Sequence, residues 1–181
     1  VMCINYKSDV IKKYFGDGAE FGVSIEYVLE EERMGTAGAL SLLKEKITEQ
    51  FFVMNGDLLT NVNFEHLHNF HISNNSMGTM CVRDYDFQVP FGVVDIENTK
   101  ILSITEKPLH KFFVNAGIYM FDPEVLDFIP RNKFYDMPSL FKKLISEGKN
   151  INSFPLREYW LDVGRIEEYE KANKDFYTDF N

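Results

Sequence analysis

Two aspartates follow strand-like segments, in positions from which a carboxylate could hold a cation or a polar ligand. The segment "FFVMNGD" (51–57) runs from four residues that favour burial directly towards Asp57. The second acid, Asp162, lies near the end of the strand-like segment "EYWLDVG" (158–164). Ligands of open α/β proteins bind beyond the carboxyl ends of the strands, so both acids suit a binding site. The alternative is an ordinary turn, because Asn, Gly and Asp are common turn residues.

Two further short segments carry groups that could bind a phosphate or a polar ligand. "GTAG" (35–38) opens a helix-like segment, and its backbone N–H groups could hold a phosphate or a nucleobase. A tight strand-to-helix turn is the alternative there. "TEKP" (105–108) places Glu106 beside Lys107, which could also be a solvated pair of charges. All four segments are expected at strand ends, which favours one common site over four unrelated turns.

The elements that would position these residues alternate between strand and helix in the first half of the chain. Ser8 is the expected N-cap of the first helix, and Gly16 or Gly18 its expected end. The sequence predicts strands at 1–5, 23–32, 51–54 and 78–86, and helices at 6–18, 35–48 and 63–75. This order predicts an α/β fold, with a three-layer, Rossmann-like arrangement whose mixed, mainly parallel sheet is flanked by helices.

The second half of the chain changes in character. A hairpin is expected over 91–108, with its turn at 97–99. The other predicted elements are a strand at 112–122, helices at 123–130 and 136–150, a strand at 151–164 and an amphipathic helix at 165–180. No repeat, low-complexity tract or linker interrupts this series, so the sequence predicts a single domain over residues 1–181.

Composition and charge exclude several classes of partner. The 181 residues are 45% hydrophobic and 26% charged, which is typical of a globular protein. The formal net charge is −9, so neither nucleic acid nor an anionic membrane is an expected partner, because both attract basic surfaces. No apolar run reaches the ~18 residues of a membrane span. A small phosphorylated ligand held by a few local cations stays compatible with this charge.

The cysteines and histidines show no metal-binding pattern. Cys3 and Cys81 lie among apolar residues and form no C-x-x-C pair, so we expect reduced core residues of a cytoplasmic protein. His66, His68 and His71 share one predicted helix without the His and acid spacing of a zinc protease. Structural roles are therefore expected for these histidines.

The order and spacing of the polar segments resemble one enzyme family. The matching segments include "GTAGAL" (35–40), "FFVMNGDLLT" (51–60), "FGVVDIENTKILSITEKP" (91–108), "FVNAGIYMFDPEVL" (113–126) and "EYWLDVGRIEEYEKAN" (158–173). They are similar to the sugar-phosphate nucleotidylyltransferases, or NDP-sugar pyrophosphorylases, and the resemblance covers essentially the whole chain. Those enzymes join an NTP and a sugar 1-phosphate into an NDP-sugar and release pyrophosphate.

Within this family the sequence looks most like guanylyltransferase-like enzymes that act on mannose, heptose or amino-sugar 1-phosphates in bacterial surface-glycan pathways. The resemblance implies the nucleotide-diphospho-sugar transferase fold, GTP as the favoured NTP, a sugar 1-phosphate as acceptor and Mg²⁺ as cofactor. The segment "LREYWLDVGRIEEYEKAN" (156–173) is similar to proteins in which this domain follows a pair of CBS domains. The nucleobase, the sugar and any homo-oligomer stay open at this stage.

The resemblance also implies roles for individual residues. Asp57 and Asp162 would hold Mg²⁺, which proteins bind by one or two carboxylates together with phosphate and water oxygens. Glu106 would accept hydrogen bonds from sugar hydroxyls, and Lys107 would approach the sugar-linked phosphate as a compact charge. Asp57, Asp162 and Lys107 would thus be the catalytic residues. The remaining implied positions are Gly92, Asn115 and Gly117 for the sugar, and Gly35, Thr36 and Gly38, with Asp57, for the nucleotide.

The sequence departs from the family pattern at its start. Members begin with a strand and a glycine-rich loop that contains an arginine, followed by Pro-Lys-Pro, and these cradle the triphosphate. The present sequence starts at Val1, where a second strand would lie. We therefore expect that about one βα unit is missing, that this chain is weakly active or inactive, and that it exposes apolar surface that favours association.

Two other functions compete with the transferase hypothesis. A non-catalytic relative that binds a nucleotide-sugar and regulates a partner would explain the missing loop. Keeping both Asp57 and Asp162 argues against it, since a pure binder has less need of paired carboxylates. A glycosyltransferase would be expected to carry Asp-x-Asp after the strand, whereas "DLL" (57–59) supplies one acid.

Overall fold

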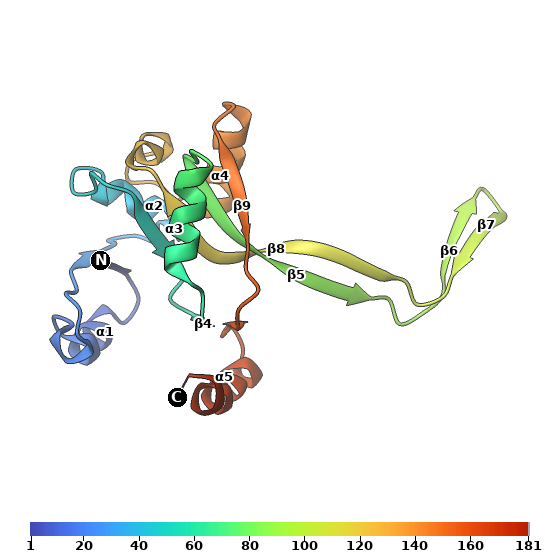
Figure 1. Cartoon of the computed structure of the whole chain (residues 1–181), viewed down its shortest axis with the longest axis horizontal. Coiled ribbons are helices and arrows are strands. Elements are labelled where there is room, and N and C mark those ends of the chain that lie inside the picture. The colour runs from blue at the N-terminus through green and yellow to red at the C-terminus, as the bar shows by residue number, and fades with distance from the viewer. Residues whose placement is uncertain (181) are drawn as a thin grey trace. The chain divides into compact units, whose positions relative to one another are not determined.

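The computed structural model describes residues 1–180, which fold into short helices and strands (Figure 1). The first half contains β1 (Met2–Ile4), α1 (Ser8–Phe15), η1 (Ala19–Phe21), β2 (Tyr27–Leu29), α2 (Gly35–Gly38), η2 (Ala39–Leu43), β3 (Phe51–Met54), β4 (Leu58–Thr60) and α3 (Phe64–Ser73), where η denotes a 3₁₀-helix. The second half contains β5 (Gly78–Gln88), β6 (Val93–Glu97), β7 (Lys100–Thr105), β8 (Leu109–Phe121), η3 (Pro123–Phe128), α4 (Met137–Ser146), β9 (Ile151–Pro155), β10 (Trp160–Asp162) and α5 (Ile166–Asp179). Within these residues no helix is both long and apolar enough to cross a membrane.

The described strands form one four-stranded sheet and three two-stranded sheets. The order of the larger sheet is β3-β8-β5-β9. β1 and β2 pair in parallel, whereas β4 pairs with β10, and β6 with β7, in antiparallel fashion. The predicted α/β fold, with a mixed sheet and flanking helices, is confirmed, and so is the predicted hairpin of β6 and β7.

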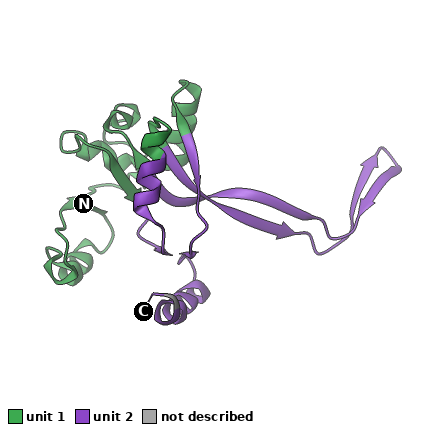
Figure 2. Cartoon of the chain, in the orientation of Figure 1, with its two compact units in different colours: residues 1–53, 71–78, 120–151 green, residues 54–70, 79–119, 152–181 purple. Residues whose placement is uncertain are grey.

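The contacts divide the chain into two compact units (Figure 2). Unit 1 comprises Val1–Val53, His71–Gly78 and Met120–Ile151, and unit 2 comprises Met54–Phe70, Thr79–Tyr119 and the described chain from Asn152 onward. β3, β5, β8 and β9 each carry residues of both units, so neither unit is one continuous segment. The single domain expected over residues 1–181 stays a prediction.

Unit 1 has an aromatic core at the end of β8. The ring centroid of Phe121 lies 5.9 Å from that of Phe51 and 5.6 Å from that of Phe141. α4 contributes Phe141 and Leu144 from one buried face, which the spacing of its apolar residues creates. Burial of these side chains provides the main stabilisation of unit 1.

Unit 2 has its core along the inner parts of β5 and β8. Ala116, Ile118 and Tyr119 of β8 and Cys81 of β5 are almost fully buried. Burial raises the pKa of the Cys81 thiol to about 12, so this cysteine stays protonated at neutral pH. β6 and β7 lie beyond the far ends of β5 and β8 and are exposed along their whole length (Figure 1).

Two predicted helices differ from the structure at their ends. The N-cap of α1 is Lys7, at φ 53°, whereas Ser8, the predicted cap, is the first helical residue. α1 ends at Phe15, and its C-cap is Gly16, one of the two predicted ends. The helix predicted at 35–48 is one α-helical turn, α2, followed by the 3₁₀-helix η2, because two glycines in the first turn disfavour a regular α-helix.

Three strands also differ from the prediction. The strand predicted at 23–32 shortens to β2, because the Val23 N–H bonds back into the preceding turn. The strand predicted at 151–164 divides into β9 and β10, and between them the Glu158 carbonyl oxygen accepts a hydrogen bond from the Arg83 side chain instead of a strand partner. β4 was not predicted, since three residues are too few to show a period of two.

Candidate active site

Asp57 and Asp162 lie next to each other at one end of the β4–β10 pair. β4 begins immediately after Asp57, and β10 ends at Asp162, which lies opposite Leu58 in the antiparallel register. The Val163 N–H donates to the Asp57 carbonyl oxygen at 2.8 Å and closes this end of the pair. The structure therefore brings together two acids that are far apart in the sequence.

The charges around Asp162 suit a cation. Burial raises the pKa of Asp162, and the nearby carboxylates of Asp57 and Glu168 raise this pKa further. A divalent cation between the carboxylates would offset their repulsion, and oxygen ligands are the preference of Mg²⁺. Among residues 1–180, no three His, Cys, Asp or Glu side chains gather closely enough to hold an ion by themselves. Phosphate and water oxygens would therefore complete the coordination of an ion held by Asp57 and Asp162.

The strand before Asp57 is less buried than the sequence suggests. β3 is an edge strand of the four-stranded sheet, and its residues alternate between half-buried and exposed, so the expectation that residues 51–54 are buried is wrong. The backbone is fixed two residues before Asp57 instead, where the Asn55 N–H donates to the Gly117 carbonyl oxygen at 2.9 Å.

The segment 115–117 of β8 packs against this backbone. Gly117 adopts φ +70°, and a Cβ at this position would lie 2.8 Å from the Asn55 side-chain nitrogen. The Asn115 side chain accepts a hydrogen bond from the Gly117 N–H at 2.9 Å and donates one to the Tyr119 hydroxyl at 2.7 Å. Gly117 is thus required by its backbone conformation and by close packing, and Asn115 stabilises the same bend of β8. Their predicted contacts with the sugar stay predictions.

Gly92, Glu106 and Lys107 form a second cluster in unit 2, at the base of the β6–β7 hairpin. A Cβ on Gly92 would lie 3.0 Å from a carboxylate oxygen of Glu106. Lys107 adopts φ 45°, an unusual conformation for a side chain-bearing residue, and its carbonyl oxygen accepts from the Gln88 side chain at 3.3 Å. Figure 1 places this hairpin at the far end of β5 and β8, away from β4. The described structure therefore shows two separate polar clusters in unit 2.

The glycine segment 35–38 lies in unit 1 and packs against the chain that leads into α4. The N–H groups of Ala37 and Gly38 both donate to the Tyr135 carbonyl oxygen, at 3.0 and 2.9 Å. A Cβ on Gly35, which has φ +76°, would lie 2.7 Å from the same oxygen. The Thr36 hydroxyl accepts from the Met137 N–H at 2.8 Å. These contacts explain the segment structurally, and its role in nucleotide recognition stays a prediction.

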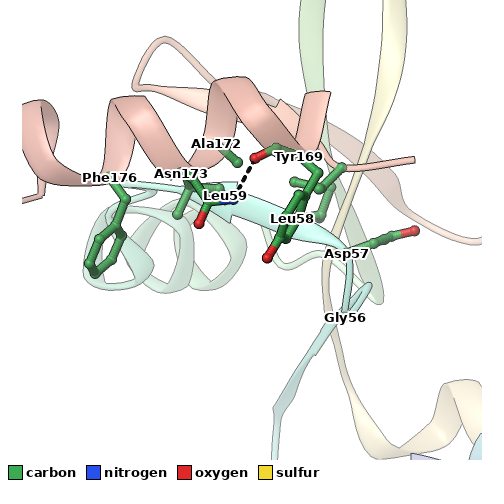
Figure 3. A pocket seen from close by; sticks show the side chains of 9 residues that line it. Gly56, Asp57, Leu58, Leu59, Tyr169, Ala172, Asn173 and Phe176 are labelled. Atoms are coloured by element: carbon green, nitrogen blue, oxygen red, sulfur yellow. Dashed lines mark hydrogen bonds between the residues drawn. The ribbon is translucent and has the colours of Figure 1, made fainter. Parts of the chain in front are cut away.

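A cavity of about 340 Å³ lies beside Asp57, between β4 and α5 (Figure 3). Its lining includes Leu58 together with Tyr169, Asn173 and Phe176 of α5. Asp57 is also part of the lining, and in Figure 3 its side chain points away from Asn173 and Phe176. Sequence reasoning did not single out α5, because Tyr169 and Phe176 fit the apolar face of an ordinary amphipathic helix and Glu168 fits its polar face.

The histidines of α3 have structural surroundings. His71 is fully buried, and its Nε2 lies 3.3 Å from a carboxylate oxygen of Asp122, which also accepts a hydrogen bond from the Gln50 side chain at 2.7 Å. His66 and His68 are exposed. This arrangement links the end of α3 to the end of β8 within unit 1.

Comparison with known proteins identifies the family. Residues 1–179 match the family described as nucleotidyl transferase. The chain belongs to the nucleotidyl transferase family. Among its relatives, a mannose-1-phosphate guanyltransferase of Kluyveromyces lactis is 34% identical over 93% of this chain, and one of Saccharomyces cerevisiae is also 34% identical over 93%. In both cases the match covers 49% of the relative, so the nucleotidyl transferase chain spans about half the length of the curated relatives that it matches.

Solved structures support the same fold. The crystal structure of HddC from Yersinia pseudotuberculosis has a TM-score of 0.72 and 24% identity, and the match covers 96% of this chain and 76% of HddC. The structure of HddC complexed with GMP-PN has the same TM-score at 22% identity, with the same coverage of both chains. At these identities the likeness shows the fold, which is the nucleotidyl transferase fold expected from the sequence.

Proposed function

We propose that the protein transfers a nucleoside monophosphate from an NTP, preferably GTP, to a sugar 1-phosphate such as mannose 1-phosphate. A phosphate oxygen of the sugar 1-phosphate attacks the α-phosphorus, the bond to the oxygen that bridges the α- and β-phosphates breaks, and pyrophosphate leaves with that oxygen and its electron pair. The attacking phosphate is already ionised at neutral pH, so the step needs no general base. The family and its guanyltransferase relatives support this reaction.

The observation that carries the proposal is the pairing of Asp57 with Asp162 at one end of β4 and β10. These carboxylates would hold Mg²⁺, which would supply neutralisation of the phosphate charge. The backbone around Asp57 is held by two hydrogen bonds, from the Val163 N–H to the Asp57 carbonyl oxygen and from the Asn55 N–H to the Gly117 carbonyl oxygen. Such fixed backbone suits the precise placement of a metal ligand. Positioning and charge neutralisation are the main tasks of such a site.

The other predicted residues receive roles that follow from their chemistry. Lys107 supplies a compact positive charge for the sugar-linked phosphate, and Glu106 accepts hydrogen bonds from sugar hydroxyls. Gly92 and Gly117 leave room for the sugar, beside Asn115. The residues proposed for the nucleobase are Gly35, Thr36 and Gly38. We place the reaction in the cytoplasm, in the synthesis of bacterial surface glycans.

A second candidate function is nucleotide-sugar binding without catalysis, for the regulation of a partner. The observation that favours it is the separation of Lys107, at the base of the hairpin, from the two aspartates in the described structure. This candidate predicts that the protein binds GDP-mannose, but releases no pyrophosphate from GTP and mannose 1-phosphate.

Pyrophosphate release from GTP and mannose 1-phosphate in the presence of Mg²⁺ tests the proposed function. We expect slow release by the wild type, in line with the weak activity expected from the sequence, and a further loss of about 10²-fold or more in Asp162→Asn, on the scale of losing one preorganised charge interaction. The matched control is Asp86→Asn, which removes an exposed acid from β5 and leaves the aspartate pair unchanged. Equal rates in Asp162→Asn and Asp86→Asn would contradict the proposal.

A further inference from the structure

Trp160 connects the strand of Asp162 to β8. It is the single tryptophan of the chain, and it lies two residues before Asp162 on β10. Its indole Nε1–H donates to the Ala116 carbonyl oxygen at 2.8 Å. Ala116 is fully buried and lies between Asn115 and Gly117. The hydrogen bond therefore joins the β10 strand to the segment of β8 that carries two proposed substrate residues.

The segment 115–117 receives a hydrogen bond from the chain on the N-terminal side of each aspartate. Two residues before Asp57, the Asn55 backbone N–H donates to the Gly117 carbonyl oxygen. Two residues before Asp162, the Trp160 side chain donates to the Ala116 carbonyl oxygen. The two segments that lead to Asp57 and Asp162 are thus hydrogen-bonded to neighbouring peptide groups of β8.

The β4–β10 pair needs such connections. Each strand has three residues, and a two-stranded pair of this size is marginally stable by itself. The indole ring of Trp160 is half-buried and provides contact area, while its N–H satisfies a carbonyl group in the core of unit 2. Removing the N–H would leave the buried Ala116 carbonyl without this donor, which favours a shift of β10 relative to β8.

We propose that Trp160 is a positioning residue of the active site, an inference that rests on the proposed function. It holds Asp162 at a fixed place relative to Asp57 and to the proposed sugar residues Asn115 and Gly117, without touching the cation or the substrate itself. Mg²⁺ demands near-ideal octahedral geometry, so a small displacement of one carboxylate weakens its binding. Loss of the Trp160 hydrogen bond therefore weakens metal binding before it affects the fold.

The test replaces Trp160 by 3-benzothienylalanine, an isostere in which sulfur takes the place of the indole N–H. The simpler variant Trp160→Phe also reduces the ring, so the isostere separates the hydrogen bond from packing. Mn²⁺ binding in the presence of GTP is measured by electron paramagnetic resonance, which needs no turnover. We expect the isostere to weaken Mn²⁺ binding by about 10–100-fold, the scale of losing an outer-shell partner of a metal ligand.

The matched control is Tyr159→Phe, one residue earlier. It removes a hydroxyl that donates to the Asp175 carboxylate of α5 at 2.5 Å, so it also deletes one hydrogen bond from the chain next to Asp162. We expect its Mn²⁺ affinity to stay within about twofold of the wild type, well below the scale of a lost outer-shell partner. Equal affinities in the isostere and the wild type, or equal losses in the isostere and Tyr159→Phe, would overturn the inference.

The same measurements separate this inference from the proposed function. Pyrophosphate release by the wild type, together with an unchanged Mn²⁺ affinity of the isostere, overturns the role of Trp160 and leaves the proposed function standing. A weakened Mn²⁺ affinity in the isostere, together with no pyrophosphate release by the wild type, supports the positioning role and contradicts the proposed transfer. A wild type that binds no Mn²⁺ overturns the role of Trp160 as well, because no metal ligand then needs to be held.

Discussion

At the residue scale, the candidate site is defined by an unfavourable arrangement of charge. Asp57 and Glu168 place negative charge near Asp162, and together with burial they raise its pKa. Without a cation, the repulsion between these neighbouring carboxylates destabilises the folded chain. The same arrangement would favour the binding of a divalent cation, because a cation between the carboxylates would relieve their repulsion. Replacing one of these carboxylates should therefore stabilise the metal-free protein and weaken metal binding.

We predict that Asp162→Asn stabilises the metal-free protein slightly at neutral pH, by about 0.5 kcal/mol or less, since the carboxylate is largely exposed. A raised folded-state pKa means that the native state binds the proton more tightly than the unfolded state, so the ionised carboxylate opposes folding above that pKa. As the pH falls through the pKa of Asp162, the carboxylate becomes protonated and no longer opposes folding. The wild type and Asp162→Asn then become equally stable. Urea denaturation at neutral and acidic pH measures this difference. A variant less stable than the wild type at neutral pH would contradict the account.

A second residue-scale prediction concerns Gly117. Gly117→Ala combines a left-handed backbone with a Cβ that meets the Asn55 side chain, so we expect a loss of about 2–4 kcal/mol. The matched control is Gly148→Ala, at φ +66°, where a Cβ meets no atom within 4 Å. Gly148→Ala should lower the free energy of unfolding by about 1 kcal/mol, through the left-handed backbone conformation alone. Equal losses in the two variants, measured by denaturant unfolding, would show that the contact with Asn55 is unimportant.

At the scale of elements, the amphipathic pattern of α4 accounts for its packing. Leu144 is fully buried in the core of unit 1, whereas its neighbour Ile145 is 62% exposed. Leu144 and Ile145 have side chains of similar volume at adjoining positions, so a difference in stability between their alanine variants reports the effect of burial. The helix itself begins after Asp136, whose side chain accepts from the Ser139 N–H, as expected of an N-cap.

We predict that Leu144→Ala destabilises the protein by about 2–5 kcal/mol, through lost burial and a residual cavity. Ile145→Ala should stay within about 0.5 kcal/mol of the wild type, the range of ordinary surface substitutions. Thermal or urea unfolding of both variants provides the measurement. Similar losses at the two positions would mean that the helix does not present the face described here.

The alternation of strands and helices could be predicted from the sequence, whereas the partners of several elements could not. Periodicity located α3, α4, α5 and the β6–β7 hairpin, because each has enough residues to show its period. It missed β4, which has three residues and is defined by its pairing with β10. Likewise Lys7, at φ 53°, is not recognisable as a cap, because its conformation depends on the surrounding turn.

At the scale of the whole molecule, the aspartates of the candidate site come from segments of unit 2 that are far apart in the sequence. Asp57 and Asp162 were identified from the sequence, but no local pattern showed that β4 and β10 would place them together. Glu168 and Trp160 were not singled out, since an exposed acid and a half-buried tryptophan are ordinary until their neighbours are known. The glycine segment 35–38 lies in unit 1, and its proposed role in nucleotide binding depends on the substrate complex.

Substrate binding should therefore stabilise the molecule through the aspartate pair. We predict that Mg²⁺ with GTP at about 100 times the dissociation constant adds roughly 2.7 kcal/mol to the free energy of unfolding. Asp57→Asn should lose most of this gain, whereas Asp86→Asn should keep it, as thermal unfolding with and without Mg²⁺ and GTP can measure. A full gain in Asp57→Asn would show that the cation binds elsewhere.

In the proposed site, Asp57 and Asp162 share one divalent cation. A crystal structure of the protein with GTP and Mn²⁺, analysed by anomalous scattering from manganese, tests it most directly. We expect one anomalous peak at the end of the β4–β10 pair, within coordinating distance of a carboxylate oxygen from each aspartate. A peak within coordinating distance of only one aspartate, or a peak elsewhere in the molecule, would show that the two aspartates do not share a cation.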